Sequence, residues 1–205
     1  MGAVVALDSL LDARRVWKGR TTAAPASTQA TGHPALDAAL PAAGWPDAAL
    51  TEVLVAADGI GELNLLWPTL ARLTHSGERV VLVAPPHVPY APAWQAAGVA
   101  LQRLAIIEAS GRDALWAAEQ CLRSGSCGAV LCWLPDADDR ALRRLQVAAE
   151  TGQTLAFAYR PASAALNPSP AALRIALDAG PAQVRILKCR GGLPPAAPLQ
   201  LAAVH

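Results

Sequence analysis

The segment at residues 54–64, Leu-Val-Ala-Ala-Asp-Gly-Ile-Gly-Glu-Leu-Asn, lies where a nucleotide-binding loop is expected. A strand-like apolar run leads into it and a helix-like apolar segment follows, as in the P-loop pattern G-x-x-x-x-G-K-[ST]. On this pattern the first glycine is an alanine, the lysine is a glutamate and the hydroxyl residue is a leucine. The residues of this predicted degenerate nucleotide loop are Ala56, Gly59, Gly61, Glu62 and Leu63.

These substitutions oppose nucleotide binding. The P-loop lysine holds the β- and γ-phosphates and the hydroxyl holds Mg²⁺. Glu62 instead brings a negative charge to the phosphate position, which at ~4 Å and an effective dielectric constant of ~20 is a repulsion of about 4 kcal/mol per charge pair. Pro68 also delays the helix, because proline is tolerated only in its first turn. We therefore expect neither ATPase activity nor a cofactor, whether the loop has decayed or never bound phosphate.

No other catalytic or metal-binding pattern stands out. The sequence lacks G-x-S-x-G, its four histidines are scattered, and its four cysteines form no C-x-x-C pair. Asp136, Asp138 and Asp139 follow a strand-like run and could bind a cation. Acids at the positive start of a helix are the more typical interpretation.

The composition indicates a globular chain without a dominant electrostatic field. Of 205 residues 53% are hydrophobic, and the formal net charge is +1. A near-neutral chain is not drawn as a whole to nucleic acid or to a membrane surface. No apolar run reaches the ~18–20 residues that span a bilayer, and no secretory signal is present. The sequence predicts a cytoplasmic protein without a membrane partner.

Strand-like and helix-like segments alternate along most of the chain. The strands are expected at residues 51–56, 78–84, 104–108, 128–134 and 154–159, with a hairpin over 173–188. This alternation predicts an α/β fold with a mostly parallel sheet covered by helices and a C-terminal β-hairpin. The predicted divisions are an N-terminal helix at 1–18, a flexible linker at 19–32, a domain at 33–192 and a Pro/Ala-rich tail at 193–205.

The N-terminal segment reads as an amphipathic helix. Leu7, Leu10, Leu11 and Trp17 lie roughly on one face of it. Such a helix can pack on its own domain or dock on a partner. Trp45 and Trp67 also lie outside the expected buried strands, and tryptophan is favoured at binding hot spots.

The order of these elements resembles the RecA ATPase core over residues 33–192. Pro86 or a neighbour occupies the place of the catalytic glutamate, and Cys132 or Trp133 that of the Walker B aspartate. The resemblance therefore implies a RecA-like P-loop NTPase-type core with a degenerate nucleotide site. It also implies that the basic residues of the last third are the best candidates for nucleic-acid or partner contact, although an ordinary exposed hairpin is the more typical interpretation. These residues are Arg160, Arg174, Arg185, Lys188 and Arg190.

Four segments together resemble the ImuA family, RecA-like and SulA-like proteins found beside an error-prone polymerase cassette in bacteria. The segments are Ala57–Asn64, Ala84–Pro92, Ala114–Gln120 and Leu142–Gln146. The resemblance implies a non-catalytic scaffold of SOS-induced translesion DNA synthesis. Its expected partners are RecA, an ImuB-type Y-family-like polymerase and, indirectly, an error-prone polymerase III alpha-type subunit, with single-stranded DNA as a further candidate. The alternatives are a SulA-type division inhibitor that sequesters FtsZ and a working ATPase with a rearranged loop.

Overall fold

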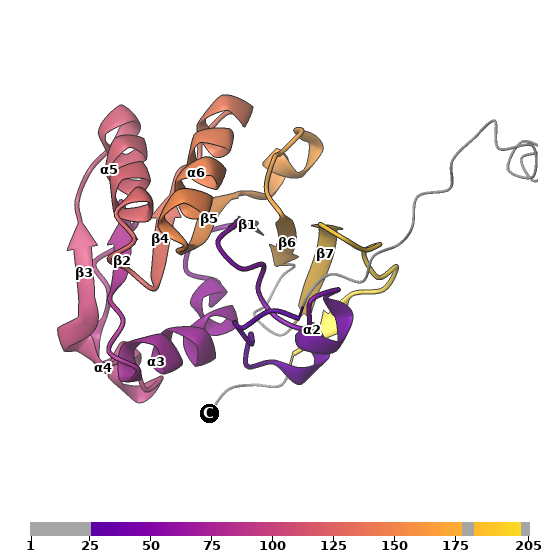
Figure 1. The fold of residues 1–205 in the computed structure, drawn as a ribbon, viewed down its shortest axis with the longest axis horizontal. Helices are drawn as coiled ribbons and strands as arrows, with labels where there is room; N and C mark the ends of the chain where they lie inside the picture. Colours follow the sequence, from indigo (N-terminus) through magenta and orange to yellow (C-terminus); the bar gives the residue numbers. More distant parts are fainter. Residues whose placement is uncertain (1–25, 178–182, 202–205) are drawn as a thin grey trace, which may run out of the picture.

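A computed structural model describes residues 26–177 and 183–201 (Figure 1). In this part of the chain eight strands form one sheet, in the order β3-β2-β4-β5-β1-β6-β7-β8. The strands are β1 (Leu50–Val55), β2 (Val80–Val83), β3 (Leu104–Ile107), β4 (Ala129–Trp133), β5 (Leu155–Pro161), β6 (Leu173–Leu177), β7 (Gln183–Cys189) and β8 (Leu199–Gln200).

The sheet is mixed. The strands from β3 to β6 in this order all run parallel, whereas β7 pairs antiparallel with β6 and β8 antiparallel with β7. Strand β1 lies between β5 and β6, and Glu52 pairs with Ala158 on one side and Arg174 on the other. All six residues of β1 are buried. The carboxyl ends of the parallel strands therefore meet at one edge, which we call the carboxyl edge.

Helices cover both faces of the sheet (Figure 1). Helices α5 and α6 pack together on one face, and α2, α3 and α4 contribute to the core on the other. The α-helices are α2 (Pro34–Ala39), α3 (Trp67–His75), α4 (Ala91–Ala96), α5 (Gly111–Arg123) and α6 (Asp139–Gly152). The 3-10 helices are η1 (Glu62–Leu65), η2 (Leu101–Arg103) and η3 (Ala162–Leu166).

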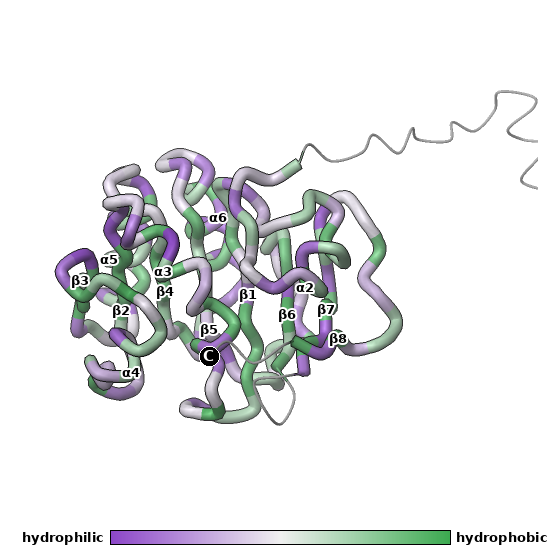
Figure 2. The backbone as a smooth tube through the Cα atoms, turned by 90° about the horizontal axis from the view of Figure 1, so that it is seen from below, coloured by the Kyte–Doolittle hydropathy of each residue, from purple (hydrophilic) through white to green (hydrophobic). Residues whose placement is uncertain are grey.

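Strand alternation divides the apolar residues between two cores. In β4, Leu131 and Trp133 point to the α3 side, whereas Val130 and Cys132 point to the α5 and α6 side. This follows from the two-residue period of a strand. Because both faces are covered, the central strands are hydrophobic almost throughout, as the green tube of Figure 2 shows.

Helices α5 and α6 are joined by polar contacts as well as by packing. Glu119 on α5 pairs with Arg123 on its own helix at 2.7 Å and with Arg144 on α6. Asp138 caps α6, because its side chain accepts a hydrogen bond from the Ala141 N–H at 2.7 Å. Ser110, at the N-cap of α5, makes no such capping hydrogen bond with its side chain.

Parts of the predicted linker and tail pack on the body of the domain. The Ser27 hydroxyl donates to the carbonyl of Trp45 at 2.6 Å, and Thr31 is buried. Trp45 is itself fully buried against Phe157, so it is a core residue and not a partner anchor. In the tail, β8 extends the sheet next to β7. The predicted helix at residues 1–18 lies outside the described residues.

The predicted fold class, a RecA-like P-loop core with a degenerate nucleotide site, needs correction. The architecture is a mixed sheet of eight strands with helices on both faces, and the segment after β1 is not a phosphate-holding loop. Gly61 adopts a left-handed conformation and η1 follows it, so that α3 begins only at Trp67. The phosphate-binding cradle of a P-loop requires a helix that starts directly at the loop.

We expect Gly152→Ala to lower the free energy of unfolding by about 1–3 kcal/mol, the usual cost of overpacking a close contact. A Cβ at this position would overlap the carbonyl oxygen of Leu122, where the end of α6 passes the end of α5. Urea denaturation measures the effect. The neighbouring exposed substitution Thr151→Ala is the control, and equal losses in both variants would contradict the steric explanation.

Candidate functional site

Three hollows lie side by side along the carboxyl edge of the sheet. The first, of about 590 Å³, lies between the starts of α5 and α6. The second, of about 390 Å³, lies between η1 and the loop at residues 85–90. The third, of about 420 Å³, lies over the ends of β1, β4 and β5. Trp133 lines all three, because β4 ends at this residue in the middle of the edge.

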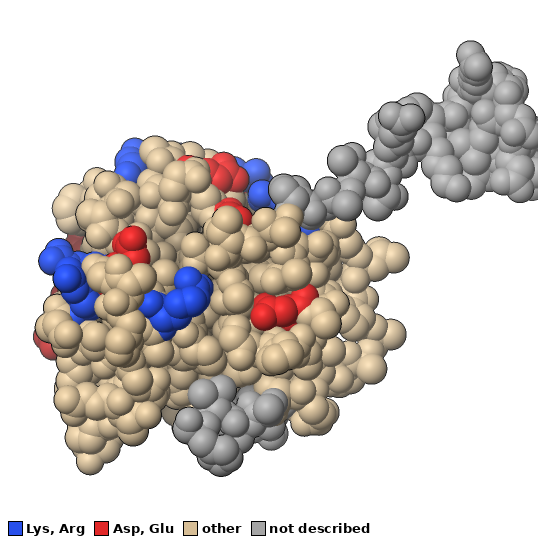
Figure 3. All heavy atoms as spheres, turned by 60° about the horizontal axis from the view of Figure 1, so that its bottom comes forward, with Lys and Arg blue, Asp and Glu red and all other residues tan. Residues whose placement is uncertain are grey.

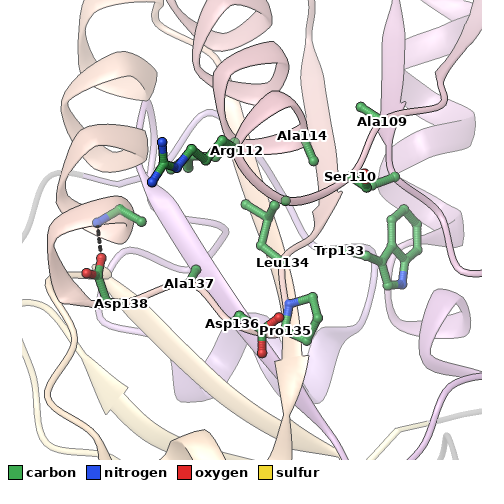
Figure 4. Close-up of a pocket in the computed structure, with 14 residues that line it drawn as sticks. Ala109, Ser110, Arg112, Ala114, Trp133, Leu134, Pro135, Asp136, Ala137 and Asp138 are labelled. Carbon is green, nitrogen blue, oxygen red and sulfur yellow. Dashed lines mark hydrogen bonds between the residues drawn. The ribbon is translucent and has the colours of Figure 1, made fainter.

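The first hollow is lined mostly by small side chains and has few functional groups (Figure 4). Ser110, Arg112, Asp136 and Asp138 are its polar side chains. The Arg112 side chain points toward α6, while Asp138 turns back to cap its own helix. Capping confirms the predicted role of Asp138 as a helix-start acid. No histidine lines the hollow, so the imidazole that activates the serine of a Ser–His pair is missing from it.

The second hollow is aromatic, and we call it the tryptophan groove. Its walls include Trp67, Trp94 and Trp133, and the loop at residues 85–90 forms its rim. Trp67 and Trp94 meet edge to face with their centroids 4.8 Å apart. Trp67 also donates to Asn64 Oδ1 at 2.7 Å, which fixes its ring. Tyr90 stands at the rim with 71% of its surface exposed.

The predicted degenerate nucleotide loop borders the second and third hollows. Ala56 is exposed in the third, whereas Gly59, Gly61, Glu62 and Leu63 line the groove. The Glu62 side chain turns inward and accepts a weak hydrogen bond from the Gly59 N–H at 3.3 Å. An amide that a phosphate-binding loop would offer to its ligand is thus used by the protein itself.

Four buried polar atoms near this edge have no hydrogen-bond partner among the described residues. They are Glu62 Oε2, Trp133 Nε1, Tyr159 OH and Arg160 Nε. Trp133 and Tyr159 stack with centroids 4.7 Å apart. Burial, with a smaller contribution from the nearby negative charge of Glu62, raises the pKa of Tyr159 well above its ordinary value. Each such atom costs roughly 1–3 kcal/mol, so their gathering at one edge is typical of a functional site.

Next to this edge, Glu52 joins two arginines in a buried ion-pair triad. Glu52 Oε1 accepts from Arg160 Nη1 at 2.6 Å and Glu52 Oε2 from Arg174 Nε at 2.8 Å. The exposed fractions of Arg160 and Arg174 are 5% and 7%. Arg174 also donates to the carbonyl of Ala164 at 2.8 Å and to that of Asn167 at 3.1 Å, which fixes η3 and the following turn. Both predicted contact residues therefore hold the fold together and are not surface groups.

The remaining predicted contact residues lie on or beside β7. Lys188 donates to the Ser169 carbonyl at 2.7 Å, and Arg190 lies 3.8 Å from Glu150. Arg185 is exposed. On the face shown in Figure 3, lysine and arginine form small separate groups and no continuous basic surface. The predicted partner helix, with Leu7, Leu10, Leu11 and Trp17, lies outside the described residues.

Within residues 26–177 and 183–201, the side chains of His, Cys, Asp and Glu do not gather in a group of three that could hold a metal ion. In the same ranges no helix is long and apolar enough to cross a membrane.

Comparison with known proteins identifies a family and a similar solved structure. A family model for SulA, described as cell division inhibitor SulA, matches residues 49–156. The crystal structure of SulA from Pseudomonas aeruginosa is 28% identical, covering 57% of this chain and 99% of that chain with a TM-score of 0.47. No curated protein matches the chain.

The family match overturns the resemblance to the ImuA family and the role in translesion synthesis that it implied. All four segments that suggested ImuA lie inside the range that the SulA model matches. Two of them supply packing residues, such as Ala118 on α5 and Leu145 on α6, so they reflect the shared core and not one particular function. RecA, the ImuB-type polymerase, the polymerase III alpha-type subunit and single-stranded DNA are therefore withdrawn as partners.

We expect Glu52→Gln to lower the free energy of unfolding by about 3–5 kcal/mol, because it leaves two buried arginines without their counter-charge. Glu150→Gln is the matched control. It makes the same chemical change at an exposed carboxylate, and we expect its free energy of unfolding to fall by less than about 1 kcal/mol. Urea denaturation of both variants measures the difference, and a loss at Glu52 as small as that at Glu150 would contradict the role of the triad.

We also expect Tyr159 to make stability fall at alkaline pH. Because burial raises the pKa of this phenol in the folded state, its contribution is fully present below the unfolded value of ~10 and is lost as pH rises through the folded value. Tyr159→Phe should flatten the decline by up to about 1.4 kcal/mol per pH unit above ~10. Tyr90→Phe, at an exposed site, should keep the wild-type slope. Parallel curves for wild type and Tyr159→Phe would refute the linkage.

Proposed function

This chain belongs to the SulA family, whose model matches more than half of its 205 residues, and we propose that it inhibits cell division by binding FtsZ. The single observation that carries the proposal is the match over residues 49–156 to the model of a cell division inhibitor. It favours a SulA-type division inhibitor over a role in translesion synthesis.

The mechanism we propose is binding without catalysis. The matched range runs from just before β1 into β5 and so includes much of the carboxyl edge with its three hollows. The one serine in the largest hollow has no histidine beside it, and Glu62 brings a negative charge to the tryptophan groove that opposes phosphate. These features support a protein that blocks a partner by occupying its surface. FtsZ acts in the cytoplasm, and we place this chain there as part of the same proposal.

The carboxyl edge is the surface that we assign to this contact. Val88 and Tyr90 stand exposed at 87% and 71% on its rim, next to the tryptophan groove. Large apolar and aromatic side chains at the centre of a contact supply most of its binding energy. The proline-rich loop that carries them would present them to the partner as one unit.

The test is sedimentation of FtsZ polymers in GTP with increasing amounts of the purified chain. We expect the pelleted FtsZ to fall in proportion to added chain and to approach its minimum near equimolar ratio, because an inhibitor that acts by occupancy is consumed stoichiometrically. An equal mass of an unrelated folded protein controls for crowding.

Two results would contradict the proposal. Unchanged pelleting at several-fold excess of the chain would exclude inhibition by binding FtsZ. Full inhibition by trace amounts would indicate an enzyme that acts on FtsZ repeatedly, against the non-catalytic mechanism.

A further inference from the structure

The tryptophan groove combines an aromatic wall with one buried carboxylate. Trp67, Trp94 and Trp133 line it, and Glu62 is the single carboxylate among its lining residues. No lysine or arginine lines the groove. Indole faces attract cations through the ring quadrupole, more strongly than phenyl or phenol rings do. A positively charged group would therefore complement the charge of the groove.

Glu62 has one oxygen engaged and one free. Its side chain is 6% exposed, and Oε1 takes the long hydrogen bond from Gly59. Oε2 has no partner among the described residues. A buried carboxylate oxygen without a donor is disfavoured, and a cationic side chain that enters the groove would supply one. A volume of about 390 Å³ is far larger than the share of about 30 Å³ that one water molecule occupies.

A peptide side chain suits the groove better than a free cation. Trp133 Nε1 lies in the same wall and lacks an acceptor among the described residues, and a peptide brings backbone carbonyl oxygens that can accept from it. The rim at Val88 and Pro89 is apolar, so it can cover the aliphatic stem of a long basic side chain and an apolar neighbour.

We propose that the tryptophan groove binds a lysine or arginine side chain carried on an apolar segment of a protein partner. The ammonium or guanidinium group pairs with Glu62 Oε2, and the indole rings of Trp67 and Trp94 flank the stem. The site is assigned from groove chemistry alone and does not depend on FtsZ being the partner.

The test uses two synthetic peptides with blocked ends, Ala-Leu-Lys-Leu-Ala and the same peptide with norleucine in place of lysine. Norleucine keeps the aliphatic stem and removes the charge. Calorimetric titration into the purified full chain should show the lysine peptide binding at least about tenfold more tightly, which corresponds to ~1.4 kcal/mol. Glu62→Gln should remove this preference, since it keeps the shape and the acceptor for Gly59 but not the charge.

Asp58→Asn is the matched control, because it removes an equal charge from an exposed position of the same loop that lines the third hollow and not the groove. It should change the affinity for the lysine peptide by less than about twofold, a free-energy difference well under 1 kcal/mol. Equal affinity of the wild type for both peptides, no binding of either peptide, or an equal loss in both variants would overturn the proposal.

A second measurement does not rely on substitution. Nuclear magnetic resonance of the indole N–H groups should show that the lysine peptide shifts the signals of Trp67, Trp94 and Trp133. Trp116 lies exposed on α5 and reports non-specific association. A shift at Trp116 as large as those in the groove would also overturn the assignment.

Discussion

Strand β1 is buried along its whole length, and it carries a carboxylate at its second pairing position with β6. That constraint shapes much of what surrounds it. A charge in the middle of a covered sheet must be paired, and Arg160 and Arg174 reach Glu52 from the two neighbouring strands. The same arginines hold carbonyl groups just before α6 and in η3. Strand order and loop position are thus tied together through one carboxylate.

The side chains presented at the carboxyl edge depend on this ion-pair triad. With Arg160 drawn toward Glu52, the end of β5 presents Tyr159 to the opposite face, where it stacks on Trp133. Aromatic rings, and with Trp133 Nε1 and Tyr159 OH two of the four unpartnered polar atoms, therefore lie on the side of α3 and α4. The largest hollow, on the other side of Trp133, has smaller side chains and no comparable set of unpaired groups. The volume of a hollow is a poorer guide to function here than the chemistry of its walls.

The sequence predicted the individual strands well and the fold class and function poorly. The continuous apolar runs at 78–84 and 128–134 are confirmed as β2 and β4, because a strand covered on both faces leaves an unmistakable pattern. The burial of Arg160 and Arg174 was not predictable, since their partner lies 108 and 122 residues away along the chain. The aromatic groove was missed for the same reason. Trp67, Trp94 and Trp133 are far apart in sequence and lie on α3, α4 and β4, so that only the folded chain brings them together.

The proline-rich rim at residues 85–90 has a thermodynamic consequence for any contact made there. Pro85, Pro86 and Pro89 fix three backbone φ angles over six positions. A loop of ordinary composition loses roughly 1–2 kcal/mol of conformational entropy for each residue that becomes ordered. Because its prolines already restrict the backbone in the free protein, this segment loses less conformational entropy when a partner binds. A small contact on such a rim can consequently be tighter than its area suggests, and its dissociation correspondingly slower.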